Sequence, residues 1–99
     1  MNMQSIMAQA QKMQRDITKK KEEIDATLFV GKSEWVEVTF SGKKELKQIN
    51  ILKDGPIMED EKEILEDMIL IATKDALSKV DAEIEKKLGS YGQSLNGLF

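Results

Sequence analysis

The 99 residues of this chain are enough for one small domain, taken to span residues 1–99, which buries only about two-thirds of its unfolded surface when it folds alone. Cysteine and histidine are both absent, which excludes a disulfide framework, a Cys/His zinc site, a thiolate nucleophile and a histidine general acid. No nucleophile–base pair stands out among the remaining residues, so we expect no enzyme, no cofactor and no small-molecule substrate. The formal net charge of −3 argues against a uniformly basic nucleic-acid binder. The longest uncharged apolar run, residues 68–72, is too short to span a membrane, so we expect a cytoplasmic protein.

The first predicted element is an amphipathic helix over residues 3–25, a segment without glycine or proline. Its apolar residues recur every seven positions, at Met3, Ala10, Ile17 and Ile24. Because residues three, four and seven apart share one face of a helix, this spacing predicts a single apolar seam. Ile6 and Met13 lie three residues after Met3 and Ala10, and Lys20 takes the next such place, three residues after Ile17, so we expect the seam to weaken there.

The opposite face of this helix carries a basic stripe. Lys12, Arg15 and Lys19 step by three and four residues and therefore lie in one line. Among the first 21 residues only Asp16 offsets five cations, which leaves a local charge of +4. A solubilising helix face usually mixes both signs, so a stripe of one sign favours a polyanionic partner.

The middle of the chain predicts three short strands, at residues 28–30, 36–40 and 48–51. Apolar and polar residues alternate in the second and third strands, the period of a strand with one buried face. Gly31 is expected to end the first strand. Gly42 lies in the turn of a hairpin between the last two strands, where we expect it to adopt a positive φ.

A second helix is predicted from about Asp60 to Leu88. Asp60 and Glu63 fit a capping box at its start, and Gly89 follows as a stop signal. Its beginning is strongly acidic, since residues 59–67 carry six acids and one lysine. Together with the basic first helix, this makes the molecule dipolar.

The first half of the second helix is apolar on two faces, because Ile64 and Ile71 lie away from Leu65, Ile69 and Ala72. One face can pack on the sheet, and the other needs either the first helix or a second subunit. We therefore expect a dimer interface at Ile64, Met68 and Ile71. The second half carries only a narrow apolar stripe and is expected to project from the body, followed by a flexible tail at residues 88–99.

In combination, these segments resemble the YbaB/EbfC family of bacterial nucleoid-associated proteins. The matching stretches are "QAQKMQ" at residues 9–14, "FVGKS" at 29–33, "WVEVTFSGKKELKQINI" at 35–51 and "DEKEILEDMILIATKDAL" at 60–77. Two shorter matches, "KKLG" at residues 86–89 and "GLF" at 97–99, extend the resemblance to the end of the chain, so that it runs over nearly the whole sequence in the same order.

The resemblance implies an α+β fold with a long N-terminal helix, a three-stranded antiparallel sheet and a long C-terminal helix, assembled as a tweezers-like homodimer. It also implies binding of duplex DNA with low sequence specificity, a role in organising the chromosome in the nucleoid, and no catalysis. The DNA-binding positions that it implies are Lys12, Arg15, Lys19, Lys20, Lys86 and Lys87.

Two other readings of the residues stay open at this level. The basic stripe is also compatible with an ordinary solvated helix face. The dimer is also compatible with a helical clamp, a chaperone-like module that grips a protein partner without contacting DNA. The salt dependence of affinity distinguishes DNA binding from an apolar protein clamp, because only binding through phosphate contacts weakens steeply as ionic strength rises.

Overall fold

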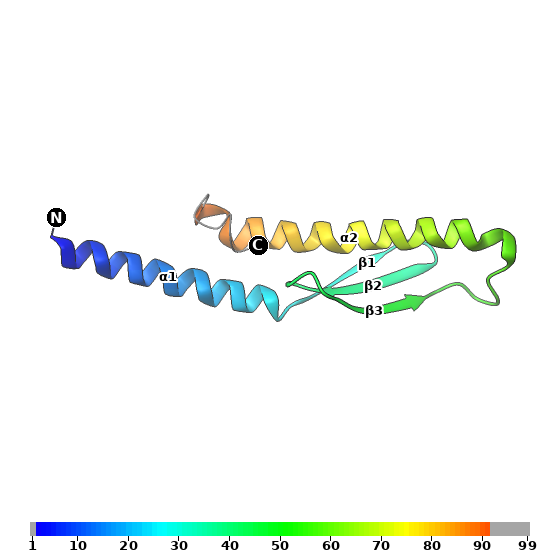
Figure 1. Cartoon of the computed structure of the whole chain (residues 1–99), viewed down its shortest axis with the longest axis horizontal. Coiled ribbons are helices and arrows are strands. Elements are labelled where there is room, and N and C mark those ends of the chain that lie inside the picture. The colour runs from blue at the N-terminus through cyan, green and yellow to red at the C-terminus, as the bar shows by residue number, and fades with distance from the viewer. Residues whose placement is uncertain (1, 92–99) are drawn as a thin grey trace.

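The computed structural model describes residues 2–91 as an elongated molecule of 70 × 19 × 17 Å, with two long helices and one sheet (Figure 1). The elements are α1 (Met3–Asp25), β1 (Leu28–Lys32), β2 (Val36–Ser41), β3 (Leu46–Ile51), a 3-10 turn η1 (Glu59–Glu61) and α2 (Lys62–Leu88). The predicted α+β fold and the order of its elements are confirmed. Most of the predicted flexible tail, residues 92–99, lies outside the described residues, and residues 89–91 form one further helical turn after α2.

Side-chain caps fix the two ends of α1 at the predicted boundaries. The Asn2 Oδ1 atom accepts a hydrogen bond of 2.8 Å from the Ser5 backbone N–H, which satisfies one free donor of the first turn. At the other end, the Thr27 hydroxyl donates to the Glu23 carbonyl oxygen at 2.7 Å. The chain then enters the sheet within two residues.

The sheet is antiparallel throughout, with strand order β1-β2-β3, and the predicted hairpin between its last two strands is confirmed. The prediction that Gly31 ends the first strand is wrong, because β1 continues to Lys32. A Cβ atom on Gly31 would overlap the Ala72 carbonyl oxygen and the Ala76 nitrogen of α2. Glycine is needed here for the close approach of strand to helix, and it does not interrupt the strand.

The expected positive φ at Gly42 is also wrong. In the turn between β2 and β3, the residue with positive φ is Lys44, at 65°. Gly42 instead lies against the end of α1, where a Cβ atom would overlap the Ile24 carbonyl group. Its N–H donates to the Thr27 carbonyl oxygen at 3.0 Å, so the turn is tied to the α1–β1 connection.

The main core forms where α2 crosses β1 and β2. Its buried residues are Val36, Val38, Phe40, Ala72 and Ala76. The two alanines are on the sheet-facing side of α2, and their small side chains let the helix backbone come close to the strands. Helix α2 packs over β1 and β2 and leaves the same face of β3 uncovered.

The start of α2 differs from the predicted capping box of Asp60 and Glu63. The turn η1 precedes the helix, and the Glu61 carboxylate accepts a 2.9 Å hydrogen bond from the Met58 N–H. Lys53 approaches the same carboxylate at 3.3 Å. The capping pair is therefore Met58 and Glu61, two residues earlier in the chain than the predicted pair.

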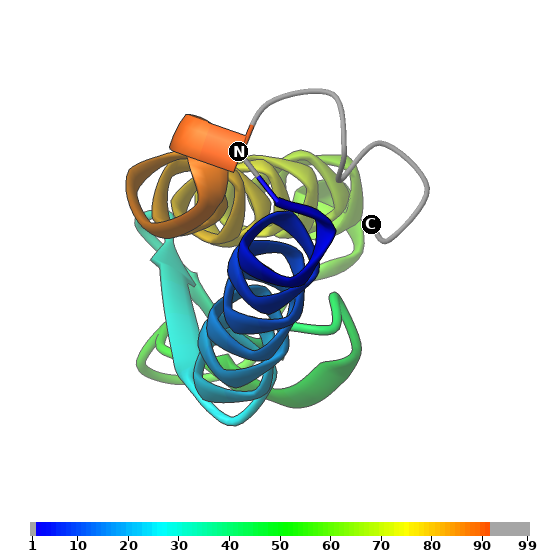
Figure 2. The same ribbon diagram turned by 90° about the vertical axis from the view of Figure 1, so that its left-hand side faces the viewer.

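The projecting part of the molecule is also different from the predicted one. The second half of α2 packs against α1 in a separate core cluster of Ile17, Ile24 and Leu88, flanked by Ile84 and Tyr91. The first half of α1 instead extends beyond the end of α2 (Figure 1), so it lies nearest the viewer in the end-on view of Figure 2, and residues 3–15 are exposed. The expectation that the second half of α2 projects is therefore wrong.

The contact at Gly31 leads to a stability prediction. Gly31→Ala places a methyl group against helix backbone that cannot rotate away, so we expect a loss of about 1–3 kcal/mol of unfolding free energy. Gly89→Ala is the matched control, because its Cβ would meet only the Glu85 carboxylate, which can rotate, and its φ of −59° is helical. The control should be neutral or stabilising by up to about 1 kcal/mol. Urea unfolding followed by circular dichroism measures both, and equal stability of the two variants would contradict the close-approach role.

Candidate nucleic-acid interface

The basic stripe of α1 is exposed along one side of the helix. Lys12, Arg15 and Lys19 are all exposed, and none of them forms an ion pair with another part of residues 2–91. Two of the three lie on the half of α1 that extends beyond α2. The structure therefore brings these predicted site residues together on a free surface.

The rotation of α1 about its axis is set by its buried residues. Ile17 and Ile24 are 5% and 0% exposed, and both face α2. With 100° between successive helical residues, this anchoring turns the basic stripe toward solvent, opposite the contact. The burial of two isoleucines seven residues apart thus decides which side of the helix a ligand can meet.

Lys20 is not part of this surface. It lies on the seam side between Ile17 and Ile24, is half-buried, and its Nζ atom is 5.2 Å from the centre of the Tyr91 ring. A lysine on the apolar seam is accommodated because its stem covers apolar surface while its ammonium group stacks on the ring. At Lys20, where the apolar seam was expected to weaken, a cation–π contact to Tyr91 takes the place of apolar packing.

The two lysines at the end of α2 have different environments. The half-buried Lys87 reaches Glu23 of α1 at 3.9 Å, so part of its charge is already matched. Lys86 is exposed and makes no ion pair among the described residues. They lie beside α1 rather than at a separate projecting tip, and only Lys86 is free to add to the surface charge.

Charge is segregated along the molecule. The acidic segment 59–67 contains η1 and the first turns of α2, at the opposite end of the 70 Å long body from the free end of α1 (Figure 1). The Debye length at physiological ionic strength is about 8 Å, so these acids exert little repulsion on a polyanion at α1. The net charge of −3 therefore does not preclude binding of a polyanion at the basic end.

The expected dimer interface on α2 is divided between core and surface. Ile64 and Ile71 are exposed, whereas Met68 packs against the main core. The two isoleucines thus face away from the sheet, as their spacing predicted. Their role as an interface remains a prediction.

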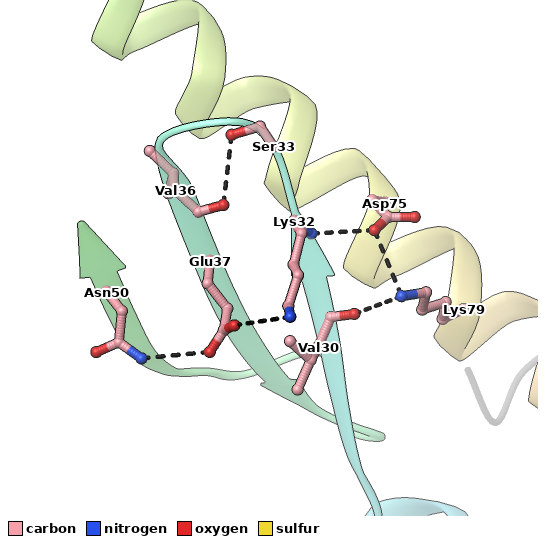
Figure 3. A network of polar contacts seen from close by, with 8 residues as sticks. All are labelled: Val30, Lys32, Ser33, Val36, Glu37, Asn50, Asp75 and Lys79. Carbon is pink, nitrogen blue, oxygen red and sulfur yellow. Dashed lines mark hydrogen bonds and ion pairs between the residues drawn. The ribbon is translucent and has the colours of Figure 1, made fainter. Parts of the chain in front are cut away.

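A polar network joins the outer edge of β1 to α2 (Figure 3). The Asp75 carboxylate accepts a 3.0 Å hydrogen bond from the Lys32 N–H, and Lys79 donates a 2.6 Å bond to the Val30 carbonyl oxygen. Asp75 and Lys79 are also paired with each other at 3.4 Å. These contacts satisfy backbone groups at a strand edge, which would otherwise be open to pairing with another chain.

The backbone hydrogen bond from Lys32 lowers the pKa of Asp75 below its ordinary value, and the Lys79 charge lowers it further. Perturbed acids often mark functional sites, yet here the cause is a structural hydrogen bond. Sequence reasoning missed this network. The i,i+4 spacing of Asp75 and Lys79 suggests a surface ion pair, and no local signal shows that a strand ends against them.

Within residues 2–91, no group of acidic side chains is arranged to hold a metal ion. No helix in the same range has the length and apolar content needed to cross a membrane.

The YbaB/EbfC DNA-binding family matches residues 1–95 of this chain. A nucleoid-associated protein of Lactococcus lactis subsp. cremoris is 47% identical over 97 residues, covering 96% of this chain and 97% of the relative. One from Ligilactobacillus salivarius is 38% identical over 100 residues, covering 99% and 95%.

Among solved structures, the uncharacterized protein HP0035 from Helicobacter pylori has a similar fold, with a TM-score of 0.68. The alignment covers 100% of this chain and 99% of that protein, at 20% sequence identity. At this identity the similarity supports the fold alone.

The Asp75 network leads to a pH-dependent prediction. Because the pKa of Asp75 is lowered on folding, its stabilising contribution is complete above the pKa of an unfolded aspartate and is lost as pH falls through the lower folded value. Asp75→Asn should therefore be less stable than the parent at neutral pH, and the difference should shrink in acid. Urea midpoints across this pH range measure the effect. Asp67→Asn is the control, since Asp67 makes no hydrogen bond or ion pair within the described chain, and a similar pH response in both variants would refute the assignment.

Proposed function

Because this chain belongs to the YbaB/EbfC DNA-binding family, we propose that it is a nucleoid-associated protein that binds duplex DNA through the phosphate backbone. The names of its relatives support this role, since proteins 34–47% identical to it are nucleoid-associated proteins. The proposed location is the nucleoid, within the cytoplasm. The proposed role is binding, with no catalytic step.

The observation that carries the proposal is the free basic stripe at Lys12, Arg15 and Lys19. Each side chain is exposed and forms no ion pair with an acid among residues 2–91, so each is available to a phosphate. Contacts from lysine and arginine to phosphates position a protein on DNA without reading its sequence. Low sequence specificity follows from this mode of contact.

The stripe has a defined length. Glu22 and Glu23 follow it on the next helical turn, and both are exposed. Glu23 is partly matched by Lys87, whereas the negative charge of Glu22 would repel a phosphate beyond Lys19. One chain therefore offers about three phosphate contacts, a small number for stable binding at physiological salt. Two chains in a homodimer would double that number, which is why we propose the homodimer as the binding unit.

The first prediction of this proposal concerns salt. If a dimer neutralises about four to six phosphates, a plot of log Kobs against log salt should have a slope between about −3.6 and −5.4. Affinity should be similar for unrelated duplexes of equal length. Fluorescence anisotropy titrations at several salt concentrations measure both quantities. A flat salt response would favour the apolar protein clamp, and a strong preference for one sequence would contradict backbone binding.

The second prediction concerns the stripe itself. The triple variant Lys12→Gln, Arg15→Gln, Lys19→Gln should stay folded, because exposed substitutions usually change stability by no more than about 0.5 kcal/mol. It should weaken binding to all duplexes alike and reduce the salt slope by about one unit for each phosphate that the variant no longer neutralises.

The matched control removes the same charge from three lysines that are already paired with acids, by the changes Lys32→Gln, Lys47→Gln and Lys62→Gln. It should retain most of the affinity. If the stripe variant is folded and binds DNA as the parent does, the stripe is a solvated helix face and the contact surface lies elsewhere, with Lys86 the next residue to test.

A further inference from the structure

The apolar seam of α1 is covered over only half of its length. Ile17 and Ile24, in the second half, are buried against the end of α2. Four apolar residues of the first half precede Ile17 by fourteen, eleven, seven and four positions and therefore share its side of the helix: Met3, Ile6, Ala10 and Met13. All four are exposed, and Met3, Ile6 and Met13 are 71%, 42% and 45% exposed. We call these four residues the free seam.

The free seam faces away from the basic stripe. Ala10 and Lys19 are nine residues apart, which places them about 180° from each other around the helix axis at 100° per residue. A phosphate held by the stripe therefore cannot cover the seam. An apolar surface also offers a phosphate no favourable contact, so the segment that covers the seam has to be apolar itself.

The uncovered half of α1 carries two of the three stripe residues, Lys12 and Arg15. No residue from 3 to 15 is buried, and none belongs to a core cluster within the described part of the chain. A helical stretch of about 12–15 residues is only marginally stable in water without tertiary packing. A segment that packs on the free seam would therefore also hold these two cations in place.

Helix α2 ends at one end of the free seam. It runs toward the N-terminal end of α1 (Figure 1), and Leu88 and Tyr91 pack against Ile17 and Ile24. The Tyr91 ring is also held by Lys20, whose Nζ atom is 5.2 Å from the ring centre. The last residue that the structure describes is thus fixed beside the covered part of the seam, one helical turn before the uncovered part begins.

The next eight residues, "GQSLNGLF" at 92–99, have the composition and length to cover the free seam. They carry no charged side chain and include Leu95, Leu98 and Phe99. Eight extended residues span about 26 Å at 3.3 Å per residue. The distance along α1 from Ile17 to Met3 is about 21 Å at 1.5 Å per residue. A chain that leaves Tyr91 can therefore follow the seam to its end.

We propose that residues 92–99 pack along the free seam of the same chain and run toward the start of α1. Leu95 lies near Ala10, whose short side chain leaves room for a larger one, and Phe99 lies near Ile6. Because the segment is uncharged, it adds no repulsion for a phosphate on the opposite side of the helix. The positioning role of this contact rests on the proposed DNA binding, since its effect is to hold the basic stripe in place.

Hydrogen–deuterium exchange without DNA tests the packing. The amides of residues 7–13 should exchange at least about tenfold more slowly in the parent than in the full-length variant Leu95→Gln, Leu98→Gln, Phe99→Gln, because packing suppresses fraying of the helix. The amides of residues 18–24, which the buried isoleucines hold, should exchange alike in both proteins and so report that the fold is intact.

The matched control changes three polar residues of the same segment, by Gln93→Ala, Ser94→Ala and Asn96→Ala. Its amides at residues 7–13 should exchange as those of the parent do. Equal exchange of these amides in the parent and the apolar-to-Gln variant would overturn the proposal. Protection of the seam would then be absent, or would come from another occupant such as a second copy of the chain.

Cross-linking tests the same contact by distance. The chain has no cysteine, so Ile6→Cys combined with Phe99→Cys introduces a single pair of thiols. A short bismaleimide should join this pair within one chain at least about tenfold faster than the control pair Ala8→Cys, Phe99→Cys, because docking raises the effective concentration of one thiol at the other. Ala8 precedes Lys12 by four residues and so lies on the basic side of α1. Equal rates for the two pairs, or a product with the mass of two chains, would contradict packing within one chain.

The positioning role is measured separately with duplex DNA. The apolar-to-Gln variant should bind at least about threefold more weakly than the parent, because a less ordered helix loses more freedom on binding. Its salt slope should be unchanged, because the same phosphates are contacted. Unchanged affinity would refute the positioning role, and the exchange and cross-linking results would still decide the packing. A parent chain that does not bind DNA would refute the proposed function and would leave those two results as they are.

Discussion

The close packing of α2 on β1 is the contact on which the rest of the structure depends. Gly31 removes a side chain on the strand, and Ala72 and Ala76 supply small ones on the helix, so the two backbones come nearly into contact. This proximity allows Asp75 and Lys79 to reach the outer edge of β1 and to satisfy its backbone groups. The helix is thereby fixed over β1 and β2, and β3 is left without a cover.

The same placement of α2 determines where α1 lies. Because α2 is much longer than the strands that it crosses, its last turns continue past the sheet and present Leu88 to Ile17 and Ile24. Gly42 holds the other side of α1 close to the hairpin turn. One end of α1 is therefore anchored between helix and turn, and the other end extends freely with its cations exposed.

Separation of charge along a narrow body lets an acidic protein present a basic surface. The cations of α1 and the acids of η1 and early α2 lie near opposite ends of the molecule (Figure 1). At cellular ionic strength the charges of one end have little effect at the other end, because the Debye length is much shorter than the molecule. Net charge is thus a poor guide to binding here, and the position of each charge on the fold is the informative quantity.

The sequence by itself determined the helices, the strands and the composition of the α1 stripe. These features depend on residues near one another in the chain: the seven-residue spacing of Ile17 and Ile24, the alternation through β2, and the three- and four-residue steps of Lys12, Arg15 and Lys19. The tertiary structure decided what those features do. It showed that Gly31 and Gly42 are points of close approach, that Lys20 stacks on Tyr91, that α1 rather than α2 projects, and that the isoleucines of β3 are uncovered. Each of these outcomes depends on contacts between residues far apart in the chain, and local periodicity specifies which face of an element is apolar but not which other element covers it.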